Sequence, residues 1–432
     1  MKSLSVFQVI LLAVFSALAI SGVLVFALFV GSGTGNTIGP IVIWGTQEPG
    51  AFTIVLRQAS ENDSRLGQVS YVQKDPVTYE NLLTEALANG TGPDLFLLRQ
   101  DYSVQNAGKV IPIPYTFLSK TQFEDVFVEA AKPYLTNDGV LGVPILIDPL
   151  IMYWNRDILG TAGFAKPPQY LDEFPSLVAK IIKRDDSGRI TKAAVAFGEY
   201  DNVDHAKDIL SLLILQAGGT ITRKDNLERL APALSTRTQG QKIQAGESAL
   251  RFYAEFADPS KVNYSWNRSL PNSRAAFAAG DLALYFGYAS EARIIARINP
   301  NLNFAPASMP QGRDRNSINV AHVYALAISR ASRNPVGART VASLIGDTSL
   351  ARALAIALDI PSARRDVLAE RSEDENVLFE NQAIIARSWI DPNPEKTSDV
   401  FRGMIETVTS GAARYGEAIG KADQQMAQII GE

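Results

Sequence analysis

The chain has 432 residues, which is too long for a single ordinary hydrophobic core, so we expect two domains. The formal net charge is only −4 and the sequence contains no run of Lys and Arg with interleaved aromatic residues, which argues against a nucleic-acid partner. The absence of cysteine excludes a disulfide framework, a thiol nucleophile and a lipid-carrying cysteine behind an apolar segment.

The longest apolar segment covers residues 6–30 and contains no charged residue. At about 1.5 Å per residue, a helix of this length measures roughly 37 Å and can cross a hydrocarbon core of about 30 Å. Lys2 precedes the segment and the next basic residue is Arg57, so the positive-inside bias places the rest of the chain outside. We therefore expect residues 1–30 to be a single-pass membrane anchor. A cleaved signal peptide and a buried helix are the alternatives, although the apolar core of a signal peptide usually has about 7–15 residues.

A flexible linker is expected at residues 31–39, which are rich in Gly, Ser and Thr. An alternation of strands and helices follows it. The expected strands are residues 41–44, 68–73 and 94–98, and the expected helices are residues 51–62 and a segment that begins at Asp75-Pro76 and ends at Asn89-Gly90. This order predicts crossover connections, a mainly parallel sheet, and ligand sites outside the carboxyl ends of its strands.

A second α/β unit is expected from about Pro149. Its expected elements are strands at residues 151–154 and 193–197 and helices at residues 171–183, 208–216, 338–358 and 412–430. The sequence therefore predicts an α/β protein with two units of similar type.

Motifs for catalysis are absent from the sequence. There are only two histidines, His205 and His322, with no second ligand at metal spacing, so we interpret both as structural. No nucleophile elbow, Walker loop or dinucleotide fingerprint occurs, so we predict no catalytic residue, no metal and no cofactor. Carboxylates are plentiful, and a pair of them placed for glycoside hydrolysis remains the basis of an enzyme alternative.

Aromatic and acidic residues cluster at the expected strand ends and loops. Sugar recognition uses this combination, because a pyranose packs its C–H face on an aromatic ring while its hydroxyls need polar partners. For any single residue of this kind, core packing or a solvated loop is the ordinary alternative. The candidates are Trp44, Glu48, Asp101, Asp148, Tyr153, Trp154, Tyr288 and Trp389.

Four segments, in this order along the chain, resemble landmarks of the maltose-type solute-binding proteins of ABC transporters. They are Pro93-Asp94 with Asp101, Gly142-Val143-Pro144 leading to Tyr153-Trp154-Asn155-Arg156-Asp157, Phe277-Ala278-Ala279-Gly280-Asp281-Leu282-Ala283-Leu284, and Asn334-Pro335 leading to Ile360-Pro361-Ser362-Ala363-Arg364. Leu284 stands where the family usually has methionine, and Arg156 stands where it usually has lysine. The resemblance covers nearly all of the chain from about Ile41.

The resemblance implies a two-lobed periplasmic-binding-protein-like fold of type II. Lobe 1 would comprise residues 40–148 and about 319–363, and lobe 2 residues 149–318 and about 364–432. The eight candidate residues correspond to cleft contacts of the family, with Tyr200 as a weaker ninth. The aromatic ones would stack on the ligand, and Glu48, Asp101 and Asp148 would bind hydroxyls.

The function implied is that of an extracellular or periplasmic receptor, held at the cell membrane, which closes on a small polar ligand. The family resemblance implies that this ligand is a sugar or oligosaccharide. Its partners would be an ABC permease and the ATPase of that permease. The alternatives are a secreted carbohydrate-acting enzyme and a surface carbohydrate receptor without a transport role.

Overall fold

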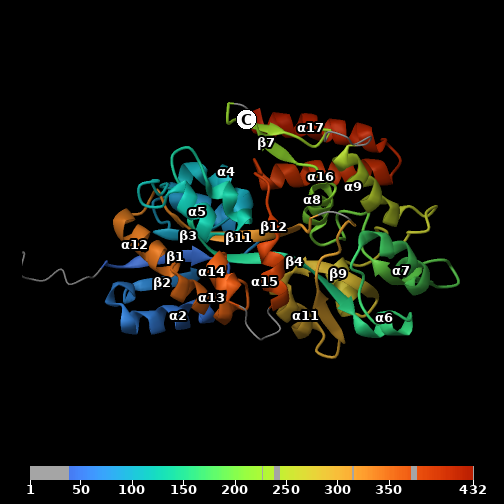
Figure 1. Ribbon diagram of the computed structural model, residues 1–432, viewed down its shortest axis with the longest axis horizontal. Helices are drawn as coiled ribbons and strands as arrows, with labels where there is room; N and C mark the ends of the chain where they lie inside the picture. Colours follow the sequence, from blue (N-terminus) through green and yellow to red (C-terminus); the bar gives the residue numbers. More distant parts are fainter. Residues whose placement is uncertain (1–37, 226, 238–243, 314–315, 371–376, 432) are drawn as a thin grey trace, which may run out of the picture.

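The computed structural model describes residues 38–225, 227–237, 244–313, 316–370 and 377–431. The expected membrane anchor at residues 1–30 and most of the expected linker lie outside these ranges. The described chain forms two α/β lobes side by side, joined by strands in the middle of the molecule (Figure 1). The prediction of a two-lobed α/β fold is therefore confirmed.

One mixed sheet of ten strands runs through both lobes. The strands are β1 (Ile41–Gly45), β2 (Val69–Gln73), β3 (Leu95–Arg99), β4 (Val143–Asn155), β5 (Lys183–Arg184), β6 (Ile190–Val195), β9 (Leu282–Tyr288), β10 (Phe304–Ala307), β11 (Asn319–Ile328) and β12 (Ala386–Arg387). Their order is β2-β1-β3-β11-β4-β9-β6-β5, with β10 beside β4 and β12 beside β11. A separate hairpin contains β7 (Thr222–Lys224) and β8 (Leu230–Pro232).

The prediction of a mainly parallel sheet is wrong. Strand β1 is parallel to β2 and β3, as expected, but β11 is antiparallel to both β3 and β4, and β4 is antiparallel to β9 and β10. The reason is that β4 carries the chain from lobe 1 to lobe 2 and β11 carries it back. Two neighbouring strands that cross between the lobes in opposite directions must be antiparallel.

Strand β4 is the main connection between the lobes. Its first part, up to Pro149, pairs with β11, and its second part, from Leu150, pairs with β9. The hydrophobic cluster of lobe 1 includes Ile147, whereas that of lobe 2 begins at Leu150. This change of partner and cluster supports the expected boundary between residues 148 and 149, which we keep as a proposal.

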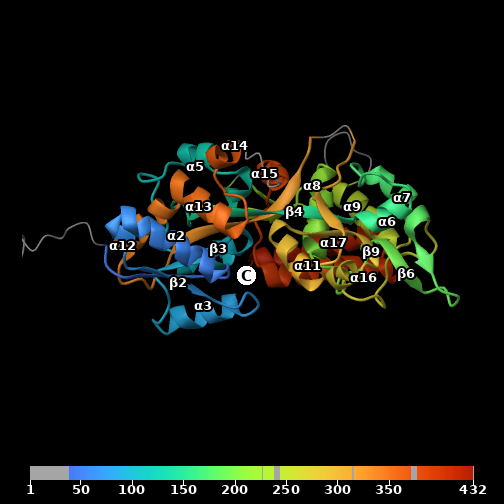
Figure 2. The ribbon, with the colours of Figure 1, turned by 90° about the horizontal axis from the view of Figure 1, so that it is seen from below.

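The helices of lobe 1 surround its half of the sheet (Figure 2). They are α2 (Pro49–Asn62), α3 (Tyr79–Ala88), α4 (Ser103–Asn106), α5 (Lys120–Val126), α12 (Pro335–Ile345), α13 (Thr348–Leu358) and α14 (Arg365–Ala369), and α15 (Val377–Ile384) lies between the lobes. The expected start of α3 at Asp75-Pro76 is too early. The Asp75 carboxylate accepts hydrogen bonds from the backbone of Val77 and Thr78 and so holds a turn before the helix.

The single helix expected at residues 338–358 is in fact two helices, α12 and α13, whose axes differ by 71°. The chain bends at Gly346, where a Cβ atom would lie 2.3 Å from a methyl group of Val143. Among the described residues no single helix has the length and hydropathy of a membrane span, whereas α12 and α13 taken together as a bent pair meet both criteria.

Lobe 2 contains α6 (Arg156–Thr161), α7 (Phe174–Ile181), α8 (Ala206–Gln216), α9 (Ala245–Ala254), α10 (Ser273–Ala278), α11 (Ala292–Ile298), α16 (Pro394–Thr409) and α17 (Tyr415–Gly431). The sequence reading missed α16, although Asn393 caps it and Pro394 occupies its first turn. Leu368 and Ala386 belong to the cluster of lobe 1, so the return to lobe 2 comes later than the expected residue 364.

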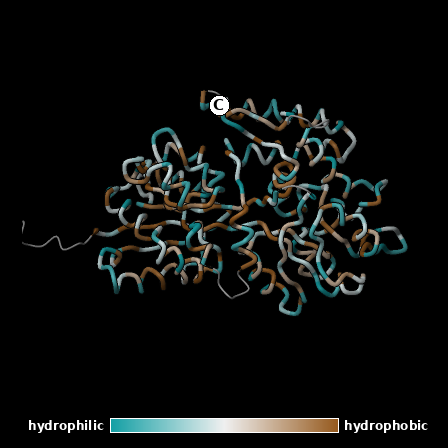
Figure 3. The backbone as a smooth tube through the Cα atoms, viewed as in Figure 1, coloured by the Kyte–Doolittle hydropathy of each residue, from teal (hydrophilic) through white to brown (hydrophobic). Residues whose placement is uncertain are grey.

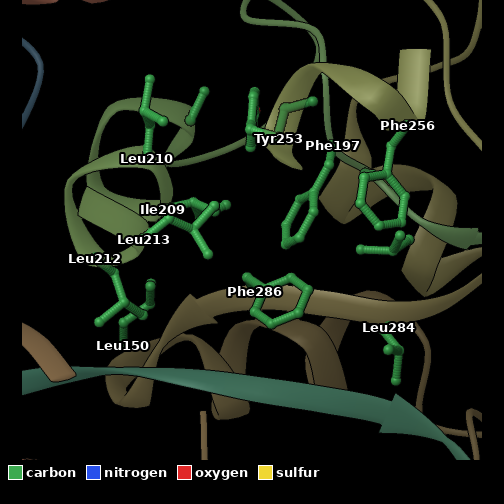
Figure 4. Close-up of a cluster of buried hydrophobic side chains, with 14 of the residues drawn as sticks. Leu150, Phe197, Ile209, Leu210, Leu212, Leu213, Tyr253, Phe256, Leu284 and Phe286 are labelled. Atoms are coloured by element: carbon green, nitrogen blue, oxygen red, sulfur yellow. The ribbon is translucent and has the colours of Figure 1, made fainter. Parts of the chain in front are cut away.

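The core of lobe 2 is rich in aromatic rings. Phe197 packs against Phe256 and Phe286, with ring centroids 5.4 and 5.0 Å apart (Figure 4). The apolar stretches of the chain lie mainly along the strands inside each lobe, and the polar ones lie on the outer helices and loops (Figure 3). Each lobe thus has its own core, which allows the two to move as separate bodies about the connecting strands.

Candidate ligand-binding cleft

An open cavity of about 540 Å³ lies between the lobes. Lobe 1 and the connecting strands line it with Arg99, Asp101, Tyr102, Asp148, His322 and Tyr324. Lobe 2 lines it with Tyr200, His205, Lys207, Asp208, Tyr288 and Glu291. Sites for small molecules commonly have volumes of about 300–1,000 Å³ and often lie between domains. Two further cavities, of about 530 and 430 Å³, each lie within a single lobe and so do not respond to lobe closure.

The lobe 1 wall follows the end of β3. Arg99 donates two hydrogen bonds of 2.7 Å to the carboxylate of Asp101, and its guanidinium lies 5.1 Å from the ring centre of Tyr102. Burial alone would raise the pKa of Asp101, but the paired Arg99 holds it at about 2. Asp101 is therefore an ionised acceptor with a fixed orientation.

The base of the cavity contains a stacked pair of rings. Tyr288, the last residue of β9, lies on the imidazole of His322 from β11, with ring centroids 4.1 Å apart and planes 24° apart. The Tyr288 hydroxyl is 3.0 Å from His322 Nε2. Burial and the nearby Arg99 lower the pKa of His322 to about 4, so the imidazole is neutral at pH 7. Because β11 crosses between the lobes, this pair lies close to the axis of any closure.

A second histidine is held by lobe 2. His205 precedes α8 with a left-handed backbone (φ 59°), and its Nε2 lies 2.6 Å from Glu291. Burial would raise the pKa of Glu291, but the hydrogen bond with His205 and that from Tyr285 bring it to about 2. Burial would lower the pKa of His205, and the same contact with Glu291 raises it instead. Arg274 lies 3.4 Å from Glu291 on the other side.

Asp148 has a different environment from that of the other carboxylates. It is only 3% exposed, and its Oδ1 accepts a hydrogen bond of 3.0 Å from the backbone of Ser290. Burial raises its pKa to about 6 because no cation within the described ranges forms an ion pair with it. It lies at the point of β4 where the chain passes between the lobes.

Lys207 and Trp389 form the wall of a smaller cavity of about 30 Å³ that shares Asp101, Tyr288 and His322 with the large one. Lys207 binds Asp391 at 2.6 Å and Thr397 Oγ1 at 2.7 Å. Its ammonium lies 5.3 Å from the ring centre of Trp389, and this ring stacks on Phe401. Trp389 is half-buried, so it both packs on the core of lobe 2 and borders the cleft.

The structure thus brings together four of the eight predicted residues. Asp101, Asp148 and Tyr288 line the large cavity and Trp389 the smaller one; the weaker candidate Tyr200 also lines the large cavity. Asp101, Asp148 and Tyr288 could be predicted from the sequence because β3, β4 and β9 all lead to the junction of the lobes.

The remaining four predicted residues do not line these two cavities. Glu48 caps α2, since its carboxylate accepts hydrogen bonds of 2.8 Å from the backbone of Gly50 and Ala51. Trp44 lies under the ammonium of Lys74, 3.8 Å from the ring centre.

Tyr153 is fully buried in lobe 2 and donates its hydroxyl hydrogen to the carbonyl of Tyr288, so in this structure it is a core residue. Trp154 is half-buried beside β10 and lies 5.6 Å from the guanidinium of Arg156. It lies on the opposite face of β4 from Tyr153, because neighbouring residues of a strand alternate between its two faces.

Several cleft residues were missed. Both histidines were interpreted as structural, and the structure puts both on the cavity wall. A signal existed for one of them: His322 and Tyr324 are polar residues two apart in β11, whose other residues after Asn319 are apolar, so the two share one face of the strand. Lys207 and Asp208 gave no signal, because a charged first turn of a helix is ordinary. Within the described chain no group of three or more His, Cys, Asp or Glu residues has the arrangement of a metal site.

Comparison with known proteins agrees with this geometry. Residues 67–345 match the sequence profile of the bacterial extracellular solute-binding proteins, which is more than half of the chain. The chain belongs to this family. A segment of 100 residues, 23% of this chain, is 28% identical to putative binding proteins of Brucella abortus and Brucella suis, and it spans 24% of the length of these relatives.

Solved solute-binding proteins share the fold at low sequence identity. The cyclic alpha-maltosyl-1,6-maltose binding protein from Arthrobacter globiformis has a TM-score of 0.74 at 16% identity, over 91% of this chain and 99% of that one. An ABC transporter solute-binding protein from Thermotoga lettingae, bound with alpha-D-tagatose, has a TM-score of 0.68 at 20% identity, over 91% and 100%. A cyclo/maltodextrin-binding protein complexed with maltotetraose has a TM-score of 0.71 at 14% identity, over 92% and 98%.

Proposed function

We propose that this solute-binding protein is the receptor of an ABC importer and that it binds a sugar or oligosaccharide between its lobes. The observation that carries the proposal is the cavity of about 540 Å³ whose wall comes from both lobes and contains tyrosine rings next to ionised carboxylates. Tyrosines offer flat apolar faces to a pyranose, and carboxylates accept hydrogen bonds from its hydroxyls. The related folds of receptors described as bound with tagatose or maltotetraose support the same class of ligand.

Closure would follow from the placement of these groups. Asp101 belongs to lobe 1 and Tyr288 to lobe 2, so a ligand that contacts both is bound more tightly when the lobes approach each other. The ligand then shifts the population towards the closed form by the difference between its two affinities. A closed, loaded receptor is the form that an ABC permease would recognise.

We further propose that residues 1–30 tether the receptor to the membrane, with the lobes on the extracellular or periplasmic side. The length of the apolar segment and the position of Lys2 support this. Amino-terminal sequencing of the protein from its native membrane tests it. A mature chain that starts between about residues 25 and 40 would point to a cleaved signal peptide.

Binding without turnover is the expected behaviour. The carboxylates of Asp101 and Glu291 are held ionised by Arg99 and His205, so neither can serve as a general acid at neutral pH. Burial raises the pKa of Asp148 to about 6, so this cleft carboxylate gives the enzyme alternative its best residue.

A thermal-shift screen of residues 38–432 against neutral mono- and oligosaccharides tests the function. A ligand present at about 100 times its dissociation constant should add roughly 2.7 kcal/mol to the free energy of unfolding. The best ligand should be recovered intact after hours of incubation. Cleavage that the Asp148→Asn variant abolishes would favour a carbohydrate-acting enzyme, and the absence of any saccharide ligand would overturn the sugar assignment.

A further inference from the structure

The cations in the cleft are already paired with acids of the protein. Arg99 is bound by Asp101 through two hydrogen bonds of 2.7 Å, and Glu291 is shared by His205 at 2.6 Å and Arg274 at 3.4 Å. Lys207 is bound by Asp391, which is 1% exposed. An incoming anion would therefore have to break or share an existing ion pair.

Three carboxylates of the cleft form no ion pair with a described residue. They are Asp148, Asp208 and Glu395, and all three line the cavity. Asp208 lies near the hydroxyl of Tyr288 and Glu395 near that of Tyr102, close enough for each carboxylate to raise the pKa of its tyrosine. These tyrosines are neutral, and His205, which acts on Asp148 and Asp208 from a distance, is itself bound to Glu291, so none of the three carboxylates has a cation of its own within the described chain.

One of these three unpaired carboxylates, Asp148, is buried, so its charge is not simply screened by solvent as a surface charge would be. It is 97% buried in relative terms, since only 3% of its surface is exposed, and it still lines the cavity. The partners of this carboxylate are the backbone and side chain of Ser290, so its oxygens can still accept further hydrogen bonds. Because the site is buried, little solvent screens its negative charge. A group in the cavity that donates hydrogen bonds would meet this capacity, and a group that carries negative charge would be repelled.

We propose that the cleft selects saccharides that carry no anionic group, whether uncharged or bearing a protonated amine, and that Asp148 and Asp208 set this selection. The inference rests on the proposed sugar-binding function and narrows it. Uronates and sugar phosphates lose their hydration on entry and find no unpaired cation in the described wall, whereas hydroxyls and ammonium groups donate hydrogen bonds to the free carboxylates.

Matched ligands test the selection. Calorimetry at one ionic strength would compare D-glucose with D-glucuronate and D-glucosamine, D-galactose with D-galacturonate and D-galactosamine, and maltose with maltose 6'-phosphate. In any set that binds, the anionic member should bind at least about tenfold more weakly than the neutral one, which corresponds to one repelling charge at moderate dielectric. An anionic member that binds as tightly as its neutral counterpart would overturn the inference and leave the sugar receptor intact. If no member of any set binds, the proposed function itself fails, and this inference fails with it.

Variants identify the residues responsible. Asp208→Asn keeps the shape of the side chain and removes its charge. It should therefore reduce, several-fold, the ratio of the affinity for a neutral sugar to the affinity for its anionic counterpart. Asp186→Asn, at an exposed turn of lobe 2, is the matched control and should leave the ratio unchanged. Asp148→Asn gives a second, independent reading. If Asp208→Asn weakens neutral and anionic ligands equally, with an unchanged melting temperature, Asp208 only binds hydroxyls and its role in selection is refuted.

Discussion

At the scale of single residues, the described cleft carboxylates differ in what surrounds them, and Asp148 shows the consequence for stability most clearly. Its pKa of about 6 in the fold lies above its ordinary value of 3.8. Between these values the folded protein binds more protons than the unfolded chain, so the free energy of unfolding should fall as the pH rises through this window. The loss attributable to Asp148 is about 3 kcal/mol at about 1.4 kcal/mol per pKa unit.

Urea denaturation of the wild type and Asp148→Asn between pH 4 and 7 measures this loss. The difference between the two proteins should change by an amount of that order, with the variant gaining on the wild type as the pH rises. Asp101 and Glu291 have lowered pKa values of about 2, so they make the free energy of unfolding fall as the pH falls below about 4. This effect is the same in the wild type and the variant, so it cancels in the difference between them. A constant difference across the window would contradict the buried, unpaired environment of Asp148.

Substitutions of Trp389 and Tyr153 test which of the two residues binds ligand in the cleft and which belongs to the core. Trp389 is half-buried, between Phe401 and Lys207, and borders the cleft. Trp389→Ala should cost on the order of 2 kcal/mol of stability, less than the 3–5 kcal/mol typical of a fully buried ring. It should also lower saccharide affinity by about 2 kcal/mol, which is roughly thirtyfold.

Tyr153→Phe is the complementary change. It removes only the hydroxyl that donates to the carbonyls of Tyr288 and Ala289, so stability should fall by about 1–2 kcal/mol while ligand affinity stays the same. Melting temperatures without ligand and dissociation constants with it measure both effects. Normal affinity in Trp389→Ala, or a large affinity loss in Tyr153→Phe, would reverse the assignment of the two residues.

At the scale of elements, Glu48 has the role of a helix cap. Both of its carboxylate oxygens accept backbone hydrogen bonds at the start of α2, and these bonds lower its pKa below 4.5. Glu48→Ala should therefore destabilise the fold by about 1 kcal/mol, as the loss of an N-cap commonly does, without changing ligand affinity. Glu61→Ala, at an exposed position near the end of α2, is the control and should leave stability nearly unchanged. A loss of affinity in Glu48→Ala at normal stability would restore its predicted role in the cleft.

Elements were predicted best where local signals are strong. The strands β1, β2 and β3 and the helix α2 have their expected places because the spacing of their apolar residues and the Pro and Gly residues beside them mark them in the sequence. The break between α12 and α13 was not predicted, because the apolar periodicity continues across it. At the bend, Val143 lies close to Gly346, and only the tertiary structure reveals this contact.

At the scale of the whole molecule, two separate cores joined by β4 and β11 predict a closing motion. Small-angle scattering of residues 38–432 should give a smaller radius of gyration with saturating saccharide than without it. Asp101→Asn, which loses a charged contact of lobe 1, should need more ligand for the same compaction. An unchanged radius in a protein shown to be saturated would contradict closure about the connecting strands.

The lobes also touch outside the cleft. Arg293 of α11 lies 3.2 Å from Asp359, which follows α13, so an ion pair joins lobe 2 to lobe 1. Because Arg293 is largely exposed, this pair contributes little to stability. It is therefore too weak to fix the lobes in one relative position, and a bound ligand can still change that position.

The sequence by itself determined the class of fold, the family landmarks and half of the predicted cleft residues. It did so because apolar periodicity and strand ends are local properties, and because Asp101, Asp148 and Tyr288 end or interrupt buried strands. The tertiary structure alone decided the antiparallel pairing of β4 with β11, the capping role of Glu48, and the meeting of His205, Lys207 and His322 at one cavity. The strand pairing and the cavity depend on which segments distant in the chain become neighbours when two lobes assemble, whereas the Glu48 cap is a local contact with Gly50 and Ala51 by a residue that the family resemblance had assigned to the ligand instead.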